Sequence, residues 1–299
     1  MKRNLKMLSV IGLAATTLIA CADTESEGTQ NGESSGDFDS SSNVHVVTRE
    51  MGSGTRDAFA EMTGLVDGDN DLIDPGATAQ QGTNAVNSTV ADDLYSIGYT
   101  SIGAVDDSLR AVPVDGVDAT EENILDGDYE IARNFNVIIG EELSETAEDF
   151  WTFMFSAEGQ AIVEEVGYIM ADTDAPAYEG QDLDLSGSID VNGSTSVYPV
   201  VEAIAEAYME IHSDVQIAVH STGSGAGVTS AIEATSDIGM ASRDLNDDEI
   251  DQVTEARPVA LDGIAVVVHP DNPLEGVTMD QVADIFRGDV STWDELLDN

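Results

Sequence analysis

The sequence predicts an α/β fold with largely parallel sheets. Runs rich in Val and Ile, which are typical of strands, alternate along the chain with stretches whose apolar residues recur at helical spacing. This alternation favours sheets covered by helices. The chain has 299 residues, of which 41% are apolar and only 5% aromatic, so we expect a core built mainly of Val, Ile, Leu and Ala.

The expected strands and helices follow one another regularly, with one interruption. Residues 171–188 are polar and have no sustained apolar period, so we expect a linker there. The strand-like runs are residues 44–48, 96–102, 135–139, 188–191, 215–220 and 259–268. The most evident helical patterns are residues 145–166, 197–209, 226–235, 247–255 and 279–286.

The first 20 residues are typical of an export signal. A basic start is followed by an apolar stretch too short to span a membrane comfortably, and then by small residues that end at Cys21, the only cysteine. The sequence Leu-Ile-Ala-Cys resembles the bacterial lipobox, so we expect Cys21 to be acylated and to anchor the protein extracytoplasmically, in a periplasm or on the outer face of the membrane. An ordinary secretory signal is the alternative. Residues 21–43 are rich in Gly, Ser and acidic residues and predict a disordered tether.

Acidic residues dominate the charge of the chain. Both lysines lie in the signal, so the chain from Cys21 onward has seven arginines against 59 acidic residues, a formal charge of −52. Such a surface repels nucleic acid and anionic lipid head groups, so no nucleic-acid partner is expected. The absence of lysine beyond the signal favours a protein that works in concentrated salt over a merely acidic exported one.

Three segments share one plan, in which a strand-like run leads through a turn of Gly, Ser and Thr into a helical run. They are VVTREMGSGTRDAF at 47–60, VNGSTSVYPVVEAI at 191–204 and VHSTGSGAGVTSAI at 219–232. A helix start presents free backbone N–H groups and the positive end of the helix dipole, glycine lets an anion approach, and Ser or Thr adds a hydroxyl donor. One such turn is weak evidence, because Ser and Thr are also common helix caps. Three of them indicate a shared oxyanion pocket.

Arginines are scarce, and Arg49 is the best candidate for an anion clamp. A guanidinium fork matches the oxygens of phosphate or sulfate. Arg49 ends a strand-like run and precedes the first turn, and ligands gather at strand ends in open α/β sheets. Arg56 and Arg243 also lie near Gly/Ser-rich turns, but pairing with a surface carboxylate explains Arg56 equally well. Such pairing is what we expect for Arg110, Arg257 and Arg287.

Signatures of enzymes and metal sites are absent from the sequence. It contains no G-x-x-x-x-G-K-[ST] nucleotide loop. No metal-ligand spacing links the histidines, so we expect no metal, no cofactor and no catalytic residue. The histidines, expected to be ordinary strand or surface residues, are His45, His212, His220 and His269.

Several long stretches resemble the PstS-type phosphate-binding proteins of phosphate ABC transporters. They are SIDVNGSTSVYPVVEAIAEAYME, HSTGSGAGVTSAI, SDIGMASRDL, VHVVTREMGSGTRDAF and the stretch from VALDGIAVVV to STWDEL. The stretches SIGYTSIGAVDDSLRAVPVDGVDATEENILDGDY and FWTFMFSAEGQAIVEEVGYI resemble the rest of that family's domain. The resemblance covers nearly all of residues 44–170 and 187–299. It implies a two-lobed type II periplasmic-binding-protein fold that closes on one dehydrated phosphate.

The order of these stretches is swapped relative to that family, in which the segment similar to 187–299 comes first. The chain therefore resembles a circular permutant, and we expect Asn43 and Asn299 to lie close together in one lobe. The implied boundaries are a signal peptide at 1–20, a tether at 21–43, lobe A at 44–132 and 276–299, lobe B at 141–264 with a linker at 171–186, and hinge crossings at 133–140 and 265–275.

The resemblance also implies which residues bind the anion. Ser242 stands where some family members carry an aspartate that accepts the phosphate proton and others carry a serine. Asp262 is the candidate for that acceptor here, with a purely structural role as an equal alternative. The implied ligand-binding residues are Arg49 as the charged clamp, Ser53, Gly54, Thr55, Thr195, Ser196, Ser224, Ser242 and Asp262.

Together these features predict a lipid-anchored, monomeric binding protein, not an enzyme, that captures inorganic phosphate and passes it to the permease of an ABC transporter. A carrier of another tetrahedral oxyanion such as sulfate is the nearest alternative. A phosphate-ester hydrolase would use the same donors, but it needs a metal cluster or an activated nucleophile that the sequence does not offer. A sensor or adhesion protein built on this fold is a further alternative.

Overall fold

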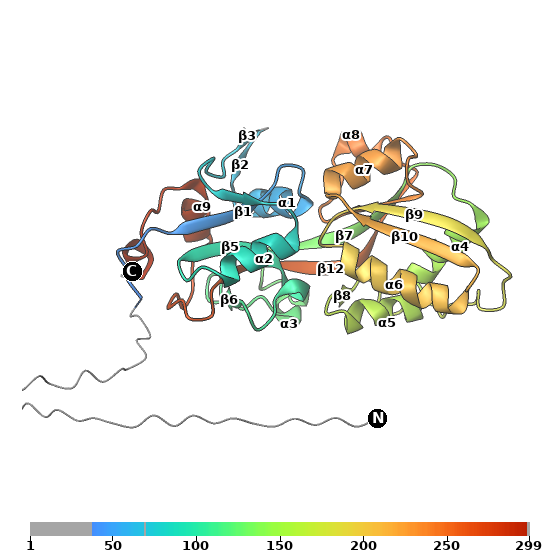
Figure 1. Cartoon of the computed structure of the whole chain (residues 1–299), viewed down its shortest axis with the longest axis horizontal. Coiled ribbons are helices and arrows are strands. Elements are labelled where there is room, and N and C mark those ends of the chain that lie inside the picture. Colours follow the sequence, from blue (N-terminus) through green and yellow to red (C-terminus); the bar gives the residue numbers. More distant parts are fainter. Residues whose placement is uncertain (1–37, 69, 298–299) are drawn as a thin grey trace, which may run out of the picture. The chain divides into compact units, whose positions relative to one another are not determined.

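One mixed sheet extends through the chain. The computed structural model describes residues 38–68 and 70–297, and Figure 1 shows how their elements are arranged. In this part of the chain the main sheet has the strand order β10-β9-β11-β7-β12-β5-β1-β4, with β6 and β8 also paired to β12. A separate two-stranded sheet joins β2 and β3.

The elements alternate along the chain much as the sequence predicts. The strands are β1 (His45–Arg49), β2 (Val66–Asp67), β3 (Asn70–Asp71), β4 (Thr78–Gln80), β5 (Ser96–Ser101), β6 (Arg110–Val112), β7 (Ala132–Ile139), β8 (Ile169–Met170), β9 (Gly187–Gly193), β10 (Val215–Ser221), β11 (Ile238–Ala241) and β12 (Glu255–Val268). The helices are α1 (Gly54–Met62), α2 (Thr83–Ala91), α3 (Glu121–Leu125), α4 (Glu145–Met154), α5 (Ala157–Glu165), α6 (Tyr198–Ile211), α7 (Ser224–Ile232), α8 (Asp247–Ile250), α9 (Met279–Arg287) and α10 (Asp294–Leu297).

The α/β class is confirmed, but the main sheet is mixed, not largely parallel. The pairs β1–β4, β1–β5, β9–β10 and β9–β11 are parallel. Every antiparallel pair described in this sheet includes β7 or β12. These two strands pass between the lobes, and their direction cannot be read from local apolar patterns, which explains the error.

The two largest apolar clusters of the described residues define two lobes. The core of lobe A contains Phe59, Tyr99 and Trp293, and that of lobe B contains Phe150 and Tyr208. In lobe A, helices α1 and α2 pack on β1 and β5, and in lobe B, helices α6 and α7 pack on β9, β10 and β11 (Figure 1). Each lobe therefore buries its own helices against its own part of the sheet.

Strand β12 changes lobe earlier than predicted. Ala260 is buried in the core of lobe B, whereas Ile264 is buried in the core of lobe A. The predicted crossing at 265–275 is therefore displaced, since Val268 also lies in the core of lobe A. Both halves of this strand are apolar, so hydrophobicity alone does not mark the point of crossing.

Strand β7 crosses at its beginning. Ile131, just before the strand, is buried in the core of lobe A, and Phe135 is buried in that of lobe B. The crossing thus coincides with only the first residues of the predicted segment 133–140. The two crossings lie side by side, because β7 and β12 pair through the register Ala132 to Gly263.

Two predicted helices differ in extent. The pattern at 145–166 is divided into α4 and α5, because the Ser156 hydroxyl starts a new helix by accepting from the Gly159 amide at 3.2 Å. The pattern at 247–255 yields only the short helix α8, since the chain enters β12 at Glu255.

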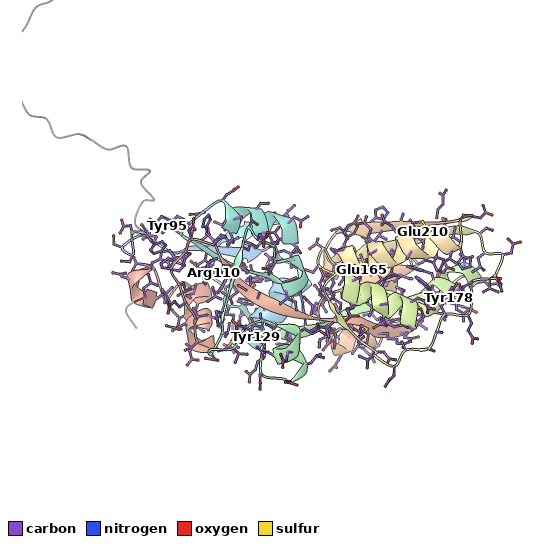
Figure 2. The ribbon with its side chains drawn as sticks, turned by 90° about the horizontal axis from the view of Figure 1, so that it is seen from below. Tyr95, Arg110, Tyr129, Glu165, Tyr178 and Glu210 are labelled. Carbon is purple, nitrogen blue, oxygen red and sulfur yellow. The ribbon has the colours of Figure 1, made fainter. Side chains whose placement is uncertain are left out.

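The predicted linker is anchored to lobe B. Residues 171–186 contain no helix or strand, and most of them are exposed. Tyr178 is buried, its hydroxyl donates to Asp149 of α4, and it lies 2.7 Å from Nε2 of His212. Figure 2 shows Tyr178 on this lobe. The linker therefore lies on the surface but is fixed by two buried side chains, those of Tyr178 and Leu185, in the core of lobe B.

The last residues of the predicted tether pack on lobe A. The Phe38 ring lies 5.0 Å from that of Tyr95 and 5.6 Å from that of Trp293, between ring centroids. The prediction of a disordered tether at 21–43 is therefore wrong for its final part. Phe38 is the single aromatic residue of that stretch, and its burial against two rings explains the order.

The beginning and the end of the described chain lie side by side in lobe A. Asn43 and Thr292 form an antiparallel bridge, and the Val44 amide donates to the Ser291 carbonyl at 3.0 Å. No helix among the described residues is long and apolar enough to cross a membrane. Outside the described residues lie the predicted signal at 1–20, Cys21 and Asn299.

Candidate anion-binding site

The three predicted turns each connect a strand to a helix, leading from β1 into α1, from β9 into α6 and from β10 into α7. The Ser53 hydroxyl caps α1 by accepting from the Arg56 amide at 3.4 Å. The N-cap positions of α6 and α7 are Val197 and Gly223, which offer no side-chain acceptor. Ahead of α6, however, the Ser194 hydroxyl accepts from the Ser196 and Val197 amides at 3.2 and 3.4 Å. Of these two starts, only that of α7 is without a hydroxyl cap, and an uncapped helix start suits an anion site.

Hydroxyls from both lobes meet beside Arg49. Thr55 of lobe A and Ser196 of lobe B have their oxygens 3.0 Å apart. Arg49 donates through Nη1 to Thr55 at 3.3 Å and through Nη2 to Thr195 at 2.9 Å. Arg49, Thr55 and Ser196 are each at most 2% exposed. A buried guanidinium surrounded by hydroxyls is well suited to hold a dehydrated oxyanion.

Ser224 and Ser242 continue the site within lobe B. Their hydroxyl oxygens are 3.2 Å apart, and the Ser242 amide donates to the Ser224 hydroxyl at 3.0 Å. Gly54 of lobe A lies against this pair, because a Cβ placed on it would be 2.9 Å from the Ser242 oxygen. The Gly225 amide also donates to the Gly52 carbonyl at 3.1 Å. The lobes thus touch at the site, and glycine is needed at position 54 for this contact.

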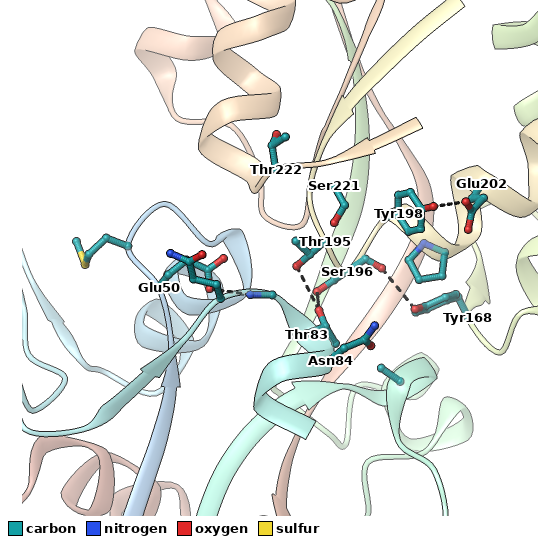
Figure 3. Close-up of a pocket in the computed structure, with 15 residues that line it drawn as sticks. Glu50, Thr83, Asn84, Tyr168, Thr195, Ser196, Tyr198, Glu202, Ser221 and Thr222 are labelled. Carbon is teal, nitrogen blue, oxygen red and sulfur yellow. Dashed lines mark hydrogen bonds between the residues drawn. The ribbon is translucent and has the colours of Figure 1, made fainter. Parts of the chain in front are cut away.

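Thr83, the first residue of α2, adds a further hydroxyl from lobe A. Its oxygen lies 3.0 Å from that of Ser196 and 3.3 Å from that of Thr195. Figure 3 shows the three side chains pointing toward one another. The name hydroxyl cluster is used below for Thr55, Thr83, Thr195, Ser196, Ser224 and Ser242.

Glu50 holds the guanidinium of Arg49 in place. Arg49 donates through Nε to one carboxylate oxygen at 2.8 Å and through Nη2 to the other at 2.9 Å, and the Gly82 amide donates to Glu50 at 3.3 Å. Burial by itself would raise the pKa of Glu50, but the hydrogen bonds and charge of Arg49 outweigh it and lower the pKa below its ordinary value. Glu50 is therefore ionised at neutral pH and fixes the orientation of the fork.

A cavity of about 750 Å³ lies beside the hydroxyl cluster (Figure 3). Both lobes contribute to its walls, lobe A through Glu50 and Thr83 and lobe B through Thr195 and Ser196. It therefore offers a small solute a route between solvent and the cluster. Its other polar lining includes Gln81, Asn84, Tyr168, Tyr198, Glu202 and Thr222.

Several known proteins that are similar to this chain are named phosphate-binding proteins. The profile of the PBP superfamily domain matches residues 29–158 and 175–299. Phosphate-binding protein PstS 2 of Streptococcus pneumoniae is 39% identical over 298 residues, which cover 98% of this chain and 99% of the relative. A crystal structure of a phosphate-binding protein of a phosphate ABC transporter from S. pneumoniae TIGR4 has a TM-score of 0.70 and 41% identity, covering 85% of this chain and 99% of that chain. Phosphate-binding protein PstS of Pseudomonas aeruginosa is 32% identical over 127 residues, 38% of this chain and 39% of the relative.

The chain belongs to the PstS-type family of phosphate-binding proteins. This confirms the predicted family and the two-lobed periplasmic-binding-protein fold. It also agrees with the prediction of a substrate-binding protein that is not an enzyme. The S. pneumoniae relative matches almost end to end, so the two chains share one order of segments. The circular permutation relative to other PstS-type proteins stays a prediction.

In this PstS-type chain, most of the predicted binding residues lie together at the site. They are Arg49, Gly54, Thr55, Thr195, Ser196, Ser224 and Ser242. Ser53 is adjacent in sequence and buried, but its hydroxyl caps α1. Asp262 does not contact the cluster directly.

Asp262 lies behind the site, paired with Arg133. It is completely buried, accepts from Arg133 at 2.9 and 3.2 Å, and accepts from the Ser101 hydroxyl at 2.6 Å. Burial raises the pKa of Asp262, and the charge of Arg133 opposes that rise. Arg133 also donates to the Ser242 carbonyl at 3.0 Å. Both carboxylate oxygens of Asp262 are thus engaged by Ser101 and Arg133, and neither has a hydrogen bond to the hydroxyl cluster.

Arg56 and Arg243 form ion pairs and lie outside the hydroxyl cluster. Arg56 pairs with the Asp71 carboxylate at 2.6 Å, in agreement with the alternative that a carboxylate holds it. Arg243, directly after Ser242 in lobe B, pairs with Glu249 at 2.7 Å and with Asp57 of lobe A at 3.2 Å. The Arg243–Asp57 pair thus joins the lobes beside the site.

Three further arginines, Arg110, Arg257 and Arg287, make contacts of different kinds. Arg287 pairs with Asp284 as expected, but Arg110 donates to backbone carbonyls and Arg257 stacks on the Phe155 ring at 3.7 Å, so surface ion pairing is wrong for those two. Within residues 38–68 and 70–297, no group of three or more His, Cys, Asp or Glu side chains is placed to hold a metal ion.

Sequence reasoning missed Glu50 and Thr83. Glu50 follows Arg49 directly, so a neighbouring carboxylate could have suggested the pair, but acidic residues are too common here to stand out. The stretch ATAQQGTNAV at 77–86 repeats the plan of strand, Gly-Thr turn and helix in a weaker form. That repeat was the available signal for Thr83.

Proposed function

We propose that this protein captures inorganic phosphate between lobes A and B and delivers it to the permease of an ABC transporter. The observation that carries the proposal is the meeting of Arg49 with hydroxyls of both lobes in a buried site. The names of the S. pneumoniae relatives support the same ligand and the same kind of transporter.

The site supplies charge through one guanidinium and hydrogen bonds through neutral groups. The Arg49 fork donates to ligand oxygens, and Thr55, Thr195, Ser196 and Ser224 add hydroxyl donors. Helices α1, α6 and α7 start here, so the positive ends of their dipoles favour an anion. Hydrogen bonds of this kind replace the water that phosphate loses when the lobes close on it.

Ser242 is proposed to accept a hydrogen bond from the protonated oxygen of the bound phosphate. Its hydroxyl can donate or accept, and among the described residues no carboxylate oxygen has a hydrogen bond to the hydroxyl cluster. Asp262 then acts indirectly, through the hydrogen bond from Arg133 to Ser242. Because a hydroxyl also donates to an unprotonated oxygen, this arrangement makes sulfate a weak competitor and not an excluded ligand.

Calorimetry with phosphate and with sulfate tests the ligand. We expect phosphate to bind, and sulfate to bind about tenfold more weakly, the effect of one mismatched neutral hydrogen bond. An assay with an aryl phosphate ester tests the hydrolase alternative, and no released phenol is expected. Heat from sulfate alone, or turnover of the ester, would refute the proposal.

We further propose that acylated Cys21 anchors the protein at the membrane and that it acts as a monomer. PstS-type proteins are extracytoplasmic, which agrees with the predicted export signal. A Cys21→Ala variant should leave the membrane fraction when it is expressed in a host that acylates lipoproteins. If the variant stays in that fraction, the anchor lies elsewhere.

The proposed circular permutation has two supports. Asn43 and Thr292 pair in lobe A, so the chain ends could be joined there. The P. aeruginosa relative matches only 38% of this chain, as one alignment does when two segments are exchanged. A variant with residues 297 and 44 linked and new ends in 171–186 should fold and bind phosphate. An insoluble product from repeated linker designs would argue against the proposal.

A further inference from the structure

We propose that Thr83, at the start of α2, is a further ligand of the bound oxyanion and supplies a fourth helix start to the site. The inference rests on the proposed phosphate-binding function and deepens it. The resemblance to PstS-type proteins placed the donors on three turns and the candidate proton acceptors at Ser242 and Asp262, and it did not include Thr83.

The backbone places the start of α2 next to the Arg49 turn. Strand β4, which leads to α2, pairs in parallel with β1 so that Gln80 lies opposite Arg49. The turn after β4 is then tied to the Arg49 fork, because the Gly82 amide donates to the carboxylate of Glu50. Thr83 is thus held at a fixed distance from the guanidinium by two independent links.

The Thr83 hydroxyl is aimed at two other hydroxyls of the site. It lies 3.0 Å from the Ser196 oxygen and 3.3 Å from the Thr195 oxygen, both on the lobe B turn, and Thr83 is only 7% exposed. Figure 3 shows this approach across the cavity wall. An anion oxygen that accepts from Thr195 and Ser196 therefore lies within reach of Thr83 as well.

The hydroxyls now bond to one another, and each has a hydrogen that can rotate toward an anion. Thr55 and Thr83 both contact Ser196 from lobe A, so Ser196 stands between two hydroxyls of the opposite lobe. A bound oxyanion would exchange these weak neutral contacts for charge-assisted ones. Thr83 would then donate from lobe A only when lobe B is closed over the ligand.

The test compares Thr83→Val with Thr83→Ser by calorimetry against inorganic phosphate. Valine keeps the shape of threonine and removes the donor, so we expect affinity to fall at least about tenfold, the effect of one hydrogen bond to a charged ligand. Serine keeps the hydroxyl and should bind nearly as well as the unchanged protein. Thr89→Val, on the same helix, removes a hydroxyl that donates to the Ala85 carbonyl at 2.8 Å and serves as the matched control.

Melting temperatures of the variants separate loss of a donor from loss of the fold, and Thr83→Ala provides a second deletion of the hydroxyl. Equal phosphate affinity in Thr83→Val and the unchanged protein would overturn the inference while leaving the proposed function standing. Absence of phosphate binding in the unchanged protein would overturn both. A loss in Thr83→Val that Thr83→Ser does not restore would assign Thr83 a packing role and also overturn the inference.

Discussion

Asp262→Asn should destabilise the protein strongly, because it leaves a buried guanidinium without its counter-charge. Asp262 is completely buried and the Arg133 side chain is 2% exposed, so neither group is solvated in the folded state. Removal of one partner of such a pair costs about 3–5 kcal/mol. For a unit of this size that corresponds to a fall in melting temperature of about 6–20 °C. Thermal unfolding at neutral pH, followed by circular dichroism, measures it.

The matched control is Asp284→Asn, which breaks the pair with Arg287. Those side chains are 50% and 35% exposed, so solvent screens the pair and the melting temperature should change by no more than about 2–4 °C. Equal, small shifts in both variants would refute the claim that Asp262 is a buried structural partner. A normal melting temperature combined with an altered phosphate-to-sulfate ratio would instead restore Asp262 as the direct proton acceptor.

Three further predictions follow from charge and contact. With a formal charge of −52 beyond the signal, the melting temperature should rise between dilute buffer and about 1 M potassium chloride, and an unchanged value would count against adaptation to salt. Gly54→Ala should weaken phosphate binding at least about tenfold, because the added Cβ meets the Ser224–Ser242 pair. Gly225→Ala, whose Cβ would lie 3.6 Å from the Gly52 carbonyl, should bind normally, and similar affinities of these variants would contradict the contact. Asp57→Asn should speed phosphate release up to about fivefold in stopped-flow measurements by removing the ion pair with Arg243, and an unchanged rate would mean that this pair does not hold the lobes together.

Features that depend on neighbouring residues could be predicted from the sequence. The β1–α1 turn with Arg49, the Ser224 turn and the surface linker each follow from neighbouring residues, and each is found in the structure. The point where β12 changes lobe was misplaced, because Ala260 and Ile264 are both apolar and buried, although in different cores. The antiparallel pairing of β7 and β12 was also missed, because it depends on the path of the chain between the lobes.

Of the site, only the turns that carry its donors could be predicted from the sequence. Arg133 lies opposite Asp262 in the register of β7 and β12, but 129 residues away in sequence. No pattern of neighbouring residues therefore predicts that pair. Thr83 meets Ser196 across 113 residues and belongs to the other lobe. The resemblance to the PstS-type family pointed to the donors that its members share. Contacts between residues far apart in sequence could be found only from the folded structure.

Phosphate titration of an Arg49→Gln variant measures whether Arg49 supplies the charge that binds the anion. Among the described residues, Arg49 has the one guanidinium that donates to hydroxyl oxygens of the cluster, so its loss removes that charge from the site. The Arg49→Gln/Glu50→Gln double variant removes both charges and guards against an effect of the unpaired carboxylate, while Arg287→Gln serves as the control for arginine loss at the surface. Both Arg49 variants should bind phosphate at least about tenfold more weakly than the control. Undiminished phosphate affinity in folded Arg49→Gln protein would show that this arginine does not hold the anion.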